Sequence, residues 1–271
     1  MTFKTPQSVS LLAGQRVHYV PYVAPRAIRS AWTAHRSING LLKRERFDGI
    51  VSTGAAIAVS AMSCPASRSV PRLYIESVSR TDGPSLSGRI LAATRLAELR
   101  TQHKAWASRK WTYAGNVLDE FDTFEADAAS SPSLFVTLGT IRPYRFDRVI
   151  DAVLASGLPD ERTVWQLGTT GRSDLPGRVL EQMSATDFAR AARNASIVVT
   201  HAGVGTILQL LDMGVYPVVV PRRKKFGEHV DDHQLQIASL LADRGIASVA
   251  DPEELRRETM LAAAARGVRA R

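Results

Sequence analysis

Residues 200–206, THAGVGT, stand between an apolar run and the helical pattern ILQLLDMG. Glycines at a strand-to-helix turn allow a ligand to approach the backbone, and the N–H groups at the helix start attract phosphate. Gly203 and Gly205 fit this chemistry, and Thr206 adds a hydroxyl donor. His201 ends the strand, where it either packs as a structural histidine or contacts the ligand. The spacing predicts a phosphate-binding turn.

Two earlier apolar runs also end in glycine turns, with the sequences TLGT and QLGTTG. The first turn contributes Gly139 and Thr140, and the second contributes Gln166 and Gly168. The carboxyl ends of parallel strands meet at one edge of a sheet, where ligands bind. One such turn can simply connect a strand to a helix, whereas three at one edge favour a ligand site.

The loop RRKKFGEHVDDHQLQ, at 222–236, follows the next apolar run. Within one turn it offers Asp232, His233 and Gln234, which supply the acceptors and donors that sugar hydroxyls need. As an alternative role, Asp231 or Asp232 can cap the helix that follows.

Carboxylates and imidazoles in this loop also raise the alternative of a metal site. Its ligands would be Glu228, His229, Asp232 and His233. Their spacing matches no strong metal motif, so we predict no metal and no other cofactor.

The elements that carry these turns alternate between apolar strands and helical patterns, which predicts a parallel sheet covered on both faces. This pattern spans a Rossmann-like domain at 133–271, and its last segment, 251–271, is predicted to be a helix. Further helices are expected at 144–156, 184–195, 205–214 and 231–245, and further strands at 196–200, 216–221 and 246–250.

The first half has a similar but looser pattern and is predicted to be a second Rossmann-like domain at 1–125, joined by a linker at 126–132. The first clear strand runs into PYVAPRAIR without a glycine, so this domain looks incomplete. Strands are expected at 16–23, 47–54, 72–77 and 110–115, and helices at about 25–44, 54–64 and 85–109.

Composition indicates a soluble globular protein, with 45% hydrophobic residues and a formal net charge of +9. Most of the basic excess lies in the first half, beside apolar residues. A membrane surface or a diphosphate substrate suits such a face as well as nucleic acid does, and a solvated face without a partner is an equal alternative. The single cysteine, Cys64, permits no internal disulfide and favours a reducing cytosol. Neither a signal peptide nor a membrane-spanning run is predicted.

Together, TLGT…VWQLGTTG…ARNASIVVTHAGVGTILQLLDMGVYPVVVPRR…GEHVDDHQLQIA resembles the C-terminal, donor-binding domain of GT-B glycosyltransferases. Within these it is similar to the peptidoglycan lipid-intermediate N-acetylglucosaminyltransferase lineage. It is more similar to the two-subunit transferase that adds the second N-acetylglucosamine to a dolichyl-diphosphate sugar, and to bacterial exopolysaccharide relatives. The segments DGIVSTGAA, RLYIESVSRTDGPSLSGRIL and WTYAGNVLDEF resemble the membrane-recruiting subunit, so the chain looks like both subunits fused.

The resemblance implies an α/β GT-B fold, with two Rossmann-like domains facing across a cleft and the first lacking its initial strand and loop. It implies inverting transfer of a hexose-type sugar from a UDP-sugar to a polyprenyl-diphosphate-linked saccharide, in surface polysaccharide biosynthesis. The enzyme would work at the cytosolic membrane face, on the lipid or on a membrane protein, without nucleic acid. An initial strand with a Gly-Gly-His-type loop, present in relatives, is expected to be absent by truncation or loss.

The resemblance also assigns roles by position. The turns at Gly139 and at 203–205 would surround the diphosphate, Gln166 and Gly168 would lie near the nucleoside, and Asp232, His233 and Gln234 near the sugar. Gln209 replaces a ribose-binding glutamate of the peptidoglycan enzyme. The full donor-binding set is Gly139, Thr140, Gln166, Gly168, His201, Gly203, Gly205, Thr206, Gln209, Glu228, Asp232, His233 and Gln234.

An inverting transfer also needs a general base for the acceptor hydroxyl. Glu76, at the end of RLYIE, and Glu228 are the candidates. Rival functions are a non-catalytic UDP-sugar-binding remnant or partner subunit, a UDP-sugar 2-epimerase, and a nucleic-acid-binding module, which lacks an aromatic stacking platform.

The predicted helix at 85–109 mixes apolar and basic residues, which suggests binding to anionic membrane. These residues are Leu86, Ile90, Leu91 and Leu96 with Arg89, Arg95 and Arg100.

Overall fold

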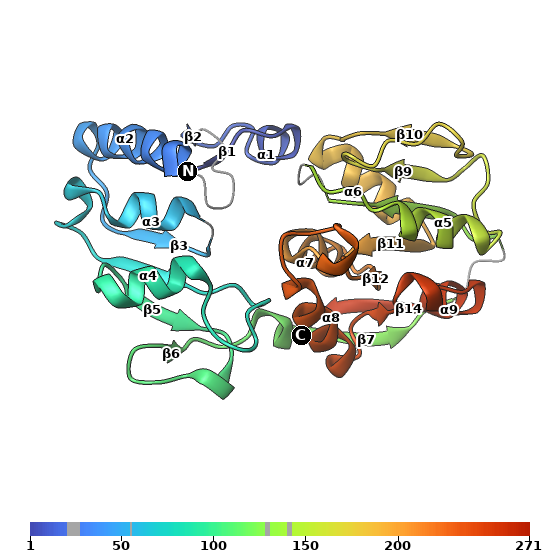
Figure 1. The fold of residues 1–271 in the computed structure, drawn as a ribbon. Helices are drawn as coiled ribbons and strands as arrows, with labels where there is room; N and C mark the ends of the chain where they lie inside the picture. Colours follow the sequence, from blue (N-terminus) through green and yellow to red (C-terminus); the bar gives the residue numbers. More distant parts are fainter. Residues whose placement is uncertain (21–27, 55, 128–130, 140–142) are drawn as a thin grey trace. The chain divides into compact units, whose positions relative to one another are not determined.

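The computed structural model describes residues 1–20, 28–54, 56–127, 131–139 and 143–271. It consists of two compact units, Met1–Val117 and Leu118–Arg271 (Figure 1). Each unit combines helices with a parallel sheet, which confirms the predicted α/β class. No helix in the described part of the chain has the length and hydropathy needed to cross a bilayer.

The second unit is built on a parallel sheet that has, in the described residues, six strands in the order β10-β9-β8-β11-β12-β13. From β8 the chain moves outward through β9 to β10, then returns to β11 and moves the other way. The order therefore reverses between β8 and β11, and ligands of such sheets bind at the carboxyl ends beside this reversal. The strands are β8 (Leu134–Thr137), β9 (Val164–Gln166), β10 (Arg178–Leu180), β11 (Ile197–His201), β12 (Val218–Val220) and β13 (Ser248–Val249).

Every residue of β8, β11 and β12 is buried, because helices cover both faces of this sheet. On one face, Phe188 of α6 and Leu210 of α7 pack against Phe135 and Val198. The oxygen of Ser184 caps α6 by accepting the backbone N–H of Asp187. The helices are α5 (Asp147–Ala155), α6 (Ala185–Asn194), α7 (Val204–Asp212), α8 (His233–Arg244) and α9 (Arg257–Ala264).

An antiparallel pair completes this unit. β7 (Phe121–Glu125) pairs along its length with β14 (Arg266–Ala270). The units therefore divide before Leu118, whereas the sequence pattern placed the boundary after residue 125. The cause is a partner strand far away in the sequence, which binds 121–125 to the second unit. Within the expected linker at 126–132, residues 128–130 lie outside the described residues.

The prediction of one helix at 251–271 is wrong, because α9 ends at Ala264 and β14 follows at once. A Cβ atom at Gly267 would overlap the ring of Phe124, so the ring occupies the space that a side chain would need. Val268 is buried. Pairing with β7 and this close packing outweigh the local preference for helix.

The first unit contains a four-stranded parallel sheet, counted in the described residues, in the order β3-β4-β5-β6. Met62 of α3 and Leu91 of α4 pack against Ile50 and Tyr74 of this sheet. Its strands are β3 (Ile50–Ser52), β4 (Arg72–Ile75), β5 (Glu98–Thr101) and β6 (Thr112–Tyr113).

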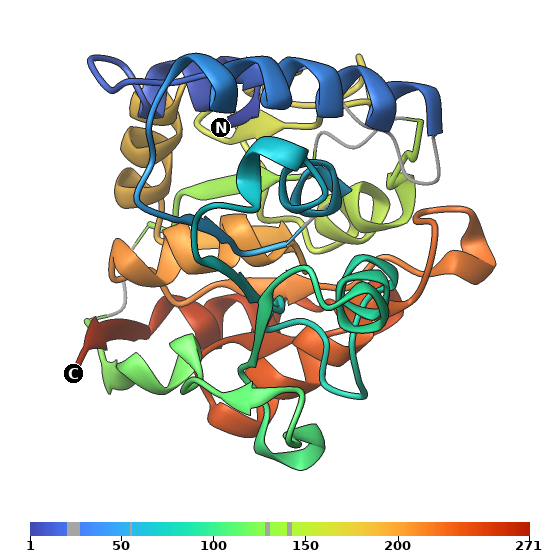
Figure 2. The ribbon, with the colours of Figure 1, turned by 90° about the vertical axis from the view of Figure 1, so that its left-hand side faces the viewer.

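A separate two-stranded parallel sheet joins β1 (Thr2–Phe3) to β2 (Tyr19–Val20). Val20 packs with Ile38 of α2, the long helix shown in blue in Figure 2. The helices of this unit are α1 (Pro6–Leu11), α2 (Ile28–Arg44), α3 (Ala56–Met62) and α4 (Leu86–Thr94). Short 3₁₀ turns in the chain lie at Pro65–Ser67, Lys104–Trp106, Val117–Glu120, Lys224–Phe226 and Pro252–Glu254.

The predicted helix at 85–109 is also wrong in extent. α4 ends at Thr94, and Arg95 adopts a left-handed conformation with φ of 52°. The chain then forms β5, in which Leu99 and Thr101 are buried. A helix cannot continue through a residue in this conformation, so the apolar residues after it turn into the sheet.

Candidate functional site

The carboxyl ends of β8 and β11 bring together three residues of the predicted site. Thr137 of β8 pairs with Thr200 of β11, so the residues that follow these strands are neighbours. A Cβ atom at Gly139 would lie 2.6 Å from Nε2 of His201, and one at Gly203 would overlap the same ring. The Nε2 end of the imidazole therefore lies against both glycines, at the reversal of the strand order.

His201 is an uncharged residue at neutral pH. Its side chain is 9% exposed, and burial, aided by the positive charge of Arg222, lowers its pKa to about 3. Its buried Nδ1 has no hydrogen-bond partner among the described residues. A neutral imidazole offers one donor and one acceptor nitrogen.

The depressed pKa predicts a pH-dependent stability. In the unfolded chain the pKa of His201 returns to about 6.5, so the unfolded state binds the extra proton between about pH 6.5 and pH 3. Above this range, protonation of His201 does not affect the free energy of unfolding. As the pH falls through the range, the unfolded chain binds the proton more readily, and the free energy of unfolding decreases by up to about 1.4 kcal/mol per pH unit. Urea unfolding at a series of pH values should show a steeper loss of stability in the wild type than in His201→Asn. Equal slopes would contradict the prediction.

The start of α7 lies directly after Gly203. The first N–H groups of a helix have no partner inside the helix and favour an anion. Gly205, in the first turn, is exposed, and a Cβ atom there would have no heavy atom within 4 Å. Thr206 and Gln209 are half-buried in the same helix. This turn can therefore receive a phosphate group without displacing a side chain.

The carboxyl end of β9 carries the two residues predicted to lie near a nucleoside. The side-chain amide of Gln166 donates to Oγ1 of Thr137 at 3.3 Å. Gly168 has a φ of 58°, a conformation that favours glycine, and lines a cavity of about 370 Å³. The cavity is bounded by Leu167, Gly168, Thr169, Gly171, Val179, Leu180 and Glu181.

Three of the predicted donor residues hold the loop after β12 in place. Gln234 accepts the backbone N–H of Arg222 at 3.0 Å, and Asp232 accepts that of Lys224 at 2.8 Å. Asp232 stands at the N-cap position of α8, yet its side chain makes no capping hydrogen bond. Glu228 is buried and accepts the backbone N–H of Arg223 at 2.9 Å.

The third predicted sugar-binding residue, His233, is half-buried at the start of α8. Its Nδ1 is in contact with Oδ1 of Asp231. Thr140 lies outside the described residues.

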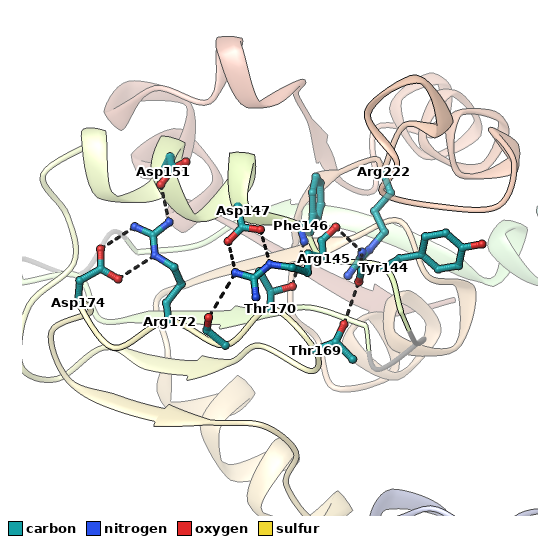
Figure 3. Close-up of polar contacts among 11 residues, drawn as sticks. Tyr144, Arg145, Phe146, Asp147, Asp151, Thr169, Thr170, Arg172, Asp174 and Arg222 are labelled. Carbon is teal, nitrogen blue, oxygen red and sulfur yellow. Dashed lines mark hydrogen bonds and ion pairs between the residues drawn. The ribbon is translucent and has the colours of Figure 1, made fainter.

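Arg222 is a residue that the sequence analysis missed, because RRKK reads as a solvated basic run. It is fully buried, and its Nη1 donates to the carbonyl oxygens of Tyr144, Arg145 and Glu228 at 3.1–3.2 Å. Figure 3 shows the guanidinium beside Tyr144 and Arg145. Burial lowers its pKa to about 10, so the charge is retained at neutral pH.

Thr169 and Thr170 fix the same loop from the other side. Oγ1 of Thr169 donates to the carbonyl of Tyr144 at 2.9 Å, and Oγ1 of Thr170 accepts the N–H of Phe146 (Figure 3). Residues 144–146, ahead of α5, are therefore tied to the segments that follow β9 and β12.

Both candidate general bases already accept hydrogen bonds on both carboxylate oxygens. Glu76, which is buried in the first unit, accepts from Tyr74, from the N–H of Ser77, and from the N–H and hydroxyl of Ser85. Glu228 also forms an ion pair with Arg148 at 3.0 Å. Both carboxylates therefore have a structural role, and the assignment of a base stays a prediction.

Comparison with known proteins adds independent findings. Residues 166–264 match the Glycosyltransferase family 28 C-terminal domain. A curated relative is the UDP-N-acetylglucosamine–N-acetylmuramyl-(pentapeptide) pyrophosphoryl-undecaprenol N-acetylglucosamine transferase of Idiomarina loihiensis. The two sequences are 37% identical over 83 residues, which are 29% of this chain and 22% of the relative. The chain matches between 19% and 37% of the length of its curated relatives, so these alignments cover less than half of them.

Solved structures resemble nearly the whole chain. The Acinetobacter baumannii MurG structure covers 93% of this chain, with 80% of its own length matched, a TM-score of 0.54 and 19% identity. The UDP-GlcNAc 2-epimerase of Methanocaldococcus jannaschii covers 92%, with 79% of its length matched, a TM-score of 0.51 and 10% identity. At these identities the likeness shows the fold alone. The chain thus has the GT-B fold, and its residues 166–264 are similar to the C-terminal domain of glycosyltransferase family 28.

Proposed function

We propose that this protein is a UDP-sugar-dependent glycosyltransferase that moves a hexose-type sugar to a polyprenyl-diphosphate-linked saccharide. The observation that carries the proposal is the neutral His201 packed against Gly139 and Gly203, directly ahead of α7 and beside the strand reversal. The family 28 match over 166–264 supports it. The name of the Idiomarina relative describes transfer of N-acetylglucosamine to a pyrophosphoryl-undecaprenol acceptor.

In this proposal the diphosphate of the donor lies against Gly139, Gly203 and the first turn of α7. The N–H groups and dipole of the helix stabilise the charge that develops as UDP leaves. His201, whose Nε2 end lies against Gly139 and Gly203, hydrogen-bonds the diphosphate or the sugar. No resident metal is needed for this step.

The remaining donor residues extend the site in two directions. The nucleoside lies near Gln166 and in the cavity beside Gly168, and Gln209 hydrogen-bonds the ribose. The sugar lies near 232–234, where His233 is the residue not already engaged in holding the loop backbone. Glu76 and Glu228 stay the candidates for the base that takes the proton from the acceptor hydroxyl.

In this proposal the enzyme works at the cytosolic face of a membrane, where a lipid-linked acceptor would lie, and takes part in exopolysaccharide biosynthesis. α4 supports this placement, since Leu86 and Ile90 are 56% and 38% exposed, with Arg89 and Arg95 also exposed. Apolar side chains with adjacent cations are suited to anionic lipid.

Substitution of both Leu86 and Ile90 by Gln should weaken binding to anionic vesicles by at least about tenfold, because the side chains would no longer insert. Vesicle sedimentation measures this. Val51→Gln is the control, since Val51 is 66% exposed on β3, outside the α4 face. If the wild type, the double variant and Val51→Gln bind the vesicles equally, α4 is not the membrane contact.

The donor site is tested by thermal unfolding with UDP, and with GDP, CDP and dTDP as controls. A ligand at 100 times its dissociation constant stabilises the folded state by about 2.7 kcal/mol, so UDP alone should raise the midpoint. No shift with any nucleotide would contradict the proposal.

Turnover then separates the functions that share this fold. A transferase consumes UDP-sugar only with a polyprenyl-diphosphate-linked acceptor present. Binding without turnover would indicate the non-catalytic remnant. Conversion of UDP-N-acetylglucosamine without acceptor would indicate a 2-epimerase, and would overturn the transferase proposal.

A further inference from the structure

Three metal-ligating side chains lie together where the loop after β12 enters α8. One ligand atom each from His229, Asp231 and His233 lie within 4.8 Å of one another. Nδ1 of His229 is 3.3 Å from Oδ1 of Asp231, and Nδ1 of His233 is in contact with the same oxygen. Two ligands about 2.1 Å from a tetrahedral ion lie roughly 3.4 Å apart, so small side-chain rotations complete the geometry.

The backbone that carries these side chains is already fixed. Asp232 accepts the N–H of Lys224, and Gln234 accepts that of Arg222, so the chain within and just after the cluster is tied to the segment that follows β12. The ring of Tyr144 stacks on that of His229, with centroids 5.9 Å apart. Little ordering is therefore required when an ion binds, which favours affinity.

The donor set indicates the class of ion. Two imidazoles and one carboxylate suit zinc and related divalent transition metals, whereas magnesium and calcium prefer oxygen ligands. Nδ1 of His229 accepts the N–H of Asp231 at 3.4 Å, so this nitrogen is unprotonated, and a bound metal would replace this long hydrogen bond.

We propose that His229, Asp231 and His233 form a binding site for one zinc-class divalent metal ion. Three protein ligands leave the fourth tetrahedral position for water or for an oxygen of a bound ligand. The site lies at the carboxyl end of β12, a strand that pairs with β11. It differs from the metal alternative weighed from the sequence, because the carboxylate is Asp231, not Glu228 or Asp232.

The test uses the full chain, free of any polyhistidine tag and stripped of metal with a chelator. Zinc affinity is measured by competition with a chromogenic chelator, and Co²⁺ absorption reports the geometry. The wild type should bind one Zn²⁺ per chain and give an intense visible Co²⁺ spectrum. Each of three variants should weaken zinc binding by about 100-fold or more: His229→Gln, Asp231→Asn and His233→Gln. This is a larger loss than is typical when the changed residue only hydrogen-bonds a metal ligand.

Matched controls separate ligand loss from general effects. Asp232→Asn removes one carboxylate charge next to Asp231 and keeps the oxygen that accepts the N–H of Lys224. His18→Gln removes a histidine in the first unit, where it contacts Ser37. Both should bind zinc as the wild type does. Circular dichroism without metal checks that every variant is folded.

A second readout is thermal unfolding, in which Zn²⁺ should raise the midpoint of the wild type and of both controls, but of none of the three ligand variants. Absence of stoichiometric binding by the wild type would overturn the proposal. So would wild-type affinity in the folded ligand variants. Because no nucleotide is present, these results are independent of the UDP test.

Discussion

Arg222→Ala is expected to destabilise the second unit by about 2–5 kcal/mol, the range seen when a large buried side chain is truncated to alanine. The substitution leaves the carbonyl oxygens of Tyr144, Arg145 and Glu228 without their charged donor, and it opens a cavity under Phe146, over whose ring the guanidinium lies. Urea unfolding followed by near-ultraviolet circular dichroism measures the effect.

Arg222→Met distinguishes lost hydrogen bonds from lost volume. Methionine fills most of the space, and it also removes the cost of burying a charge whose Nε and Nη2 have no partner among the described residues. This variant should therefore be more stable than Arg222→Ala. Lys225→Ala, at an exposed position three residues along, should change stability by less than about 0.5 kcal/mol. Loss of less than about 1 kcal/mol in Arg222→Ala would show that the ties between the loops contribute little.

Gly203→Ala is expected to abolish UDP binding and to destabilise the protein by about 1–3 kcal/mol, because the new methyl group would overlap the imidazole of His201. Gly139 approaches the same end of the ring, where a Cβ atom would lie only 2.6 Å from Nε2, so the ring has little room to shift. Calorimetric titration with UDP and urea unfolding measure the two effects.

Gly205→Ala is the matched control for this substitution. Position 205 is exposed in the first turn of α7 with open space around it, so alanine should stabilise the helix by up to about 1 kcal/mol. If the diphosphate lies against this turn, Gly205→Ala loses UDP affinity while gaining stability. Unchanged UDP affinity in both variants would exclude the glycine turn as the phosphate site.

The sheet of the second unit could be predicted from sequence because its signals are local. β-branched runs such as that of β11 form buried strands, and a glycine turn after each marks the functional edge. The meeting of Gly139, Gly203 and His201 follows from parallel pairing alone, since carboxyl ends share one edge.

Features that depend on distant partners could not be predicted. Arg266–Ala270 is a strand only because β7 lies beside it, and α4 stops at Arg95 because the residues beyond pack into the sheet. The role of Arg222 depends on three carbonyl groups, two of them nearly eighty residues earlier. A sequence pattern reports the preference of a residue for burial or solvent, and not which carbonyl its side chain will meet.

The pairing of β7 with β14 has a consequence for how the protein is made. Asp122 and Arg271 form an ion pair across 149 residues of chain, at one end of this ladder. During translation β7 leaves the ribosome long before β14 exists, and every strand of the large sheet is synthesised in the interval. The parallel sheet can assemble as it emerges, while Phe121 and Phe124 wait for their partner. Completion of this unit therefore waits until β14 has been synthesised, later than every strand of the parallel sheet.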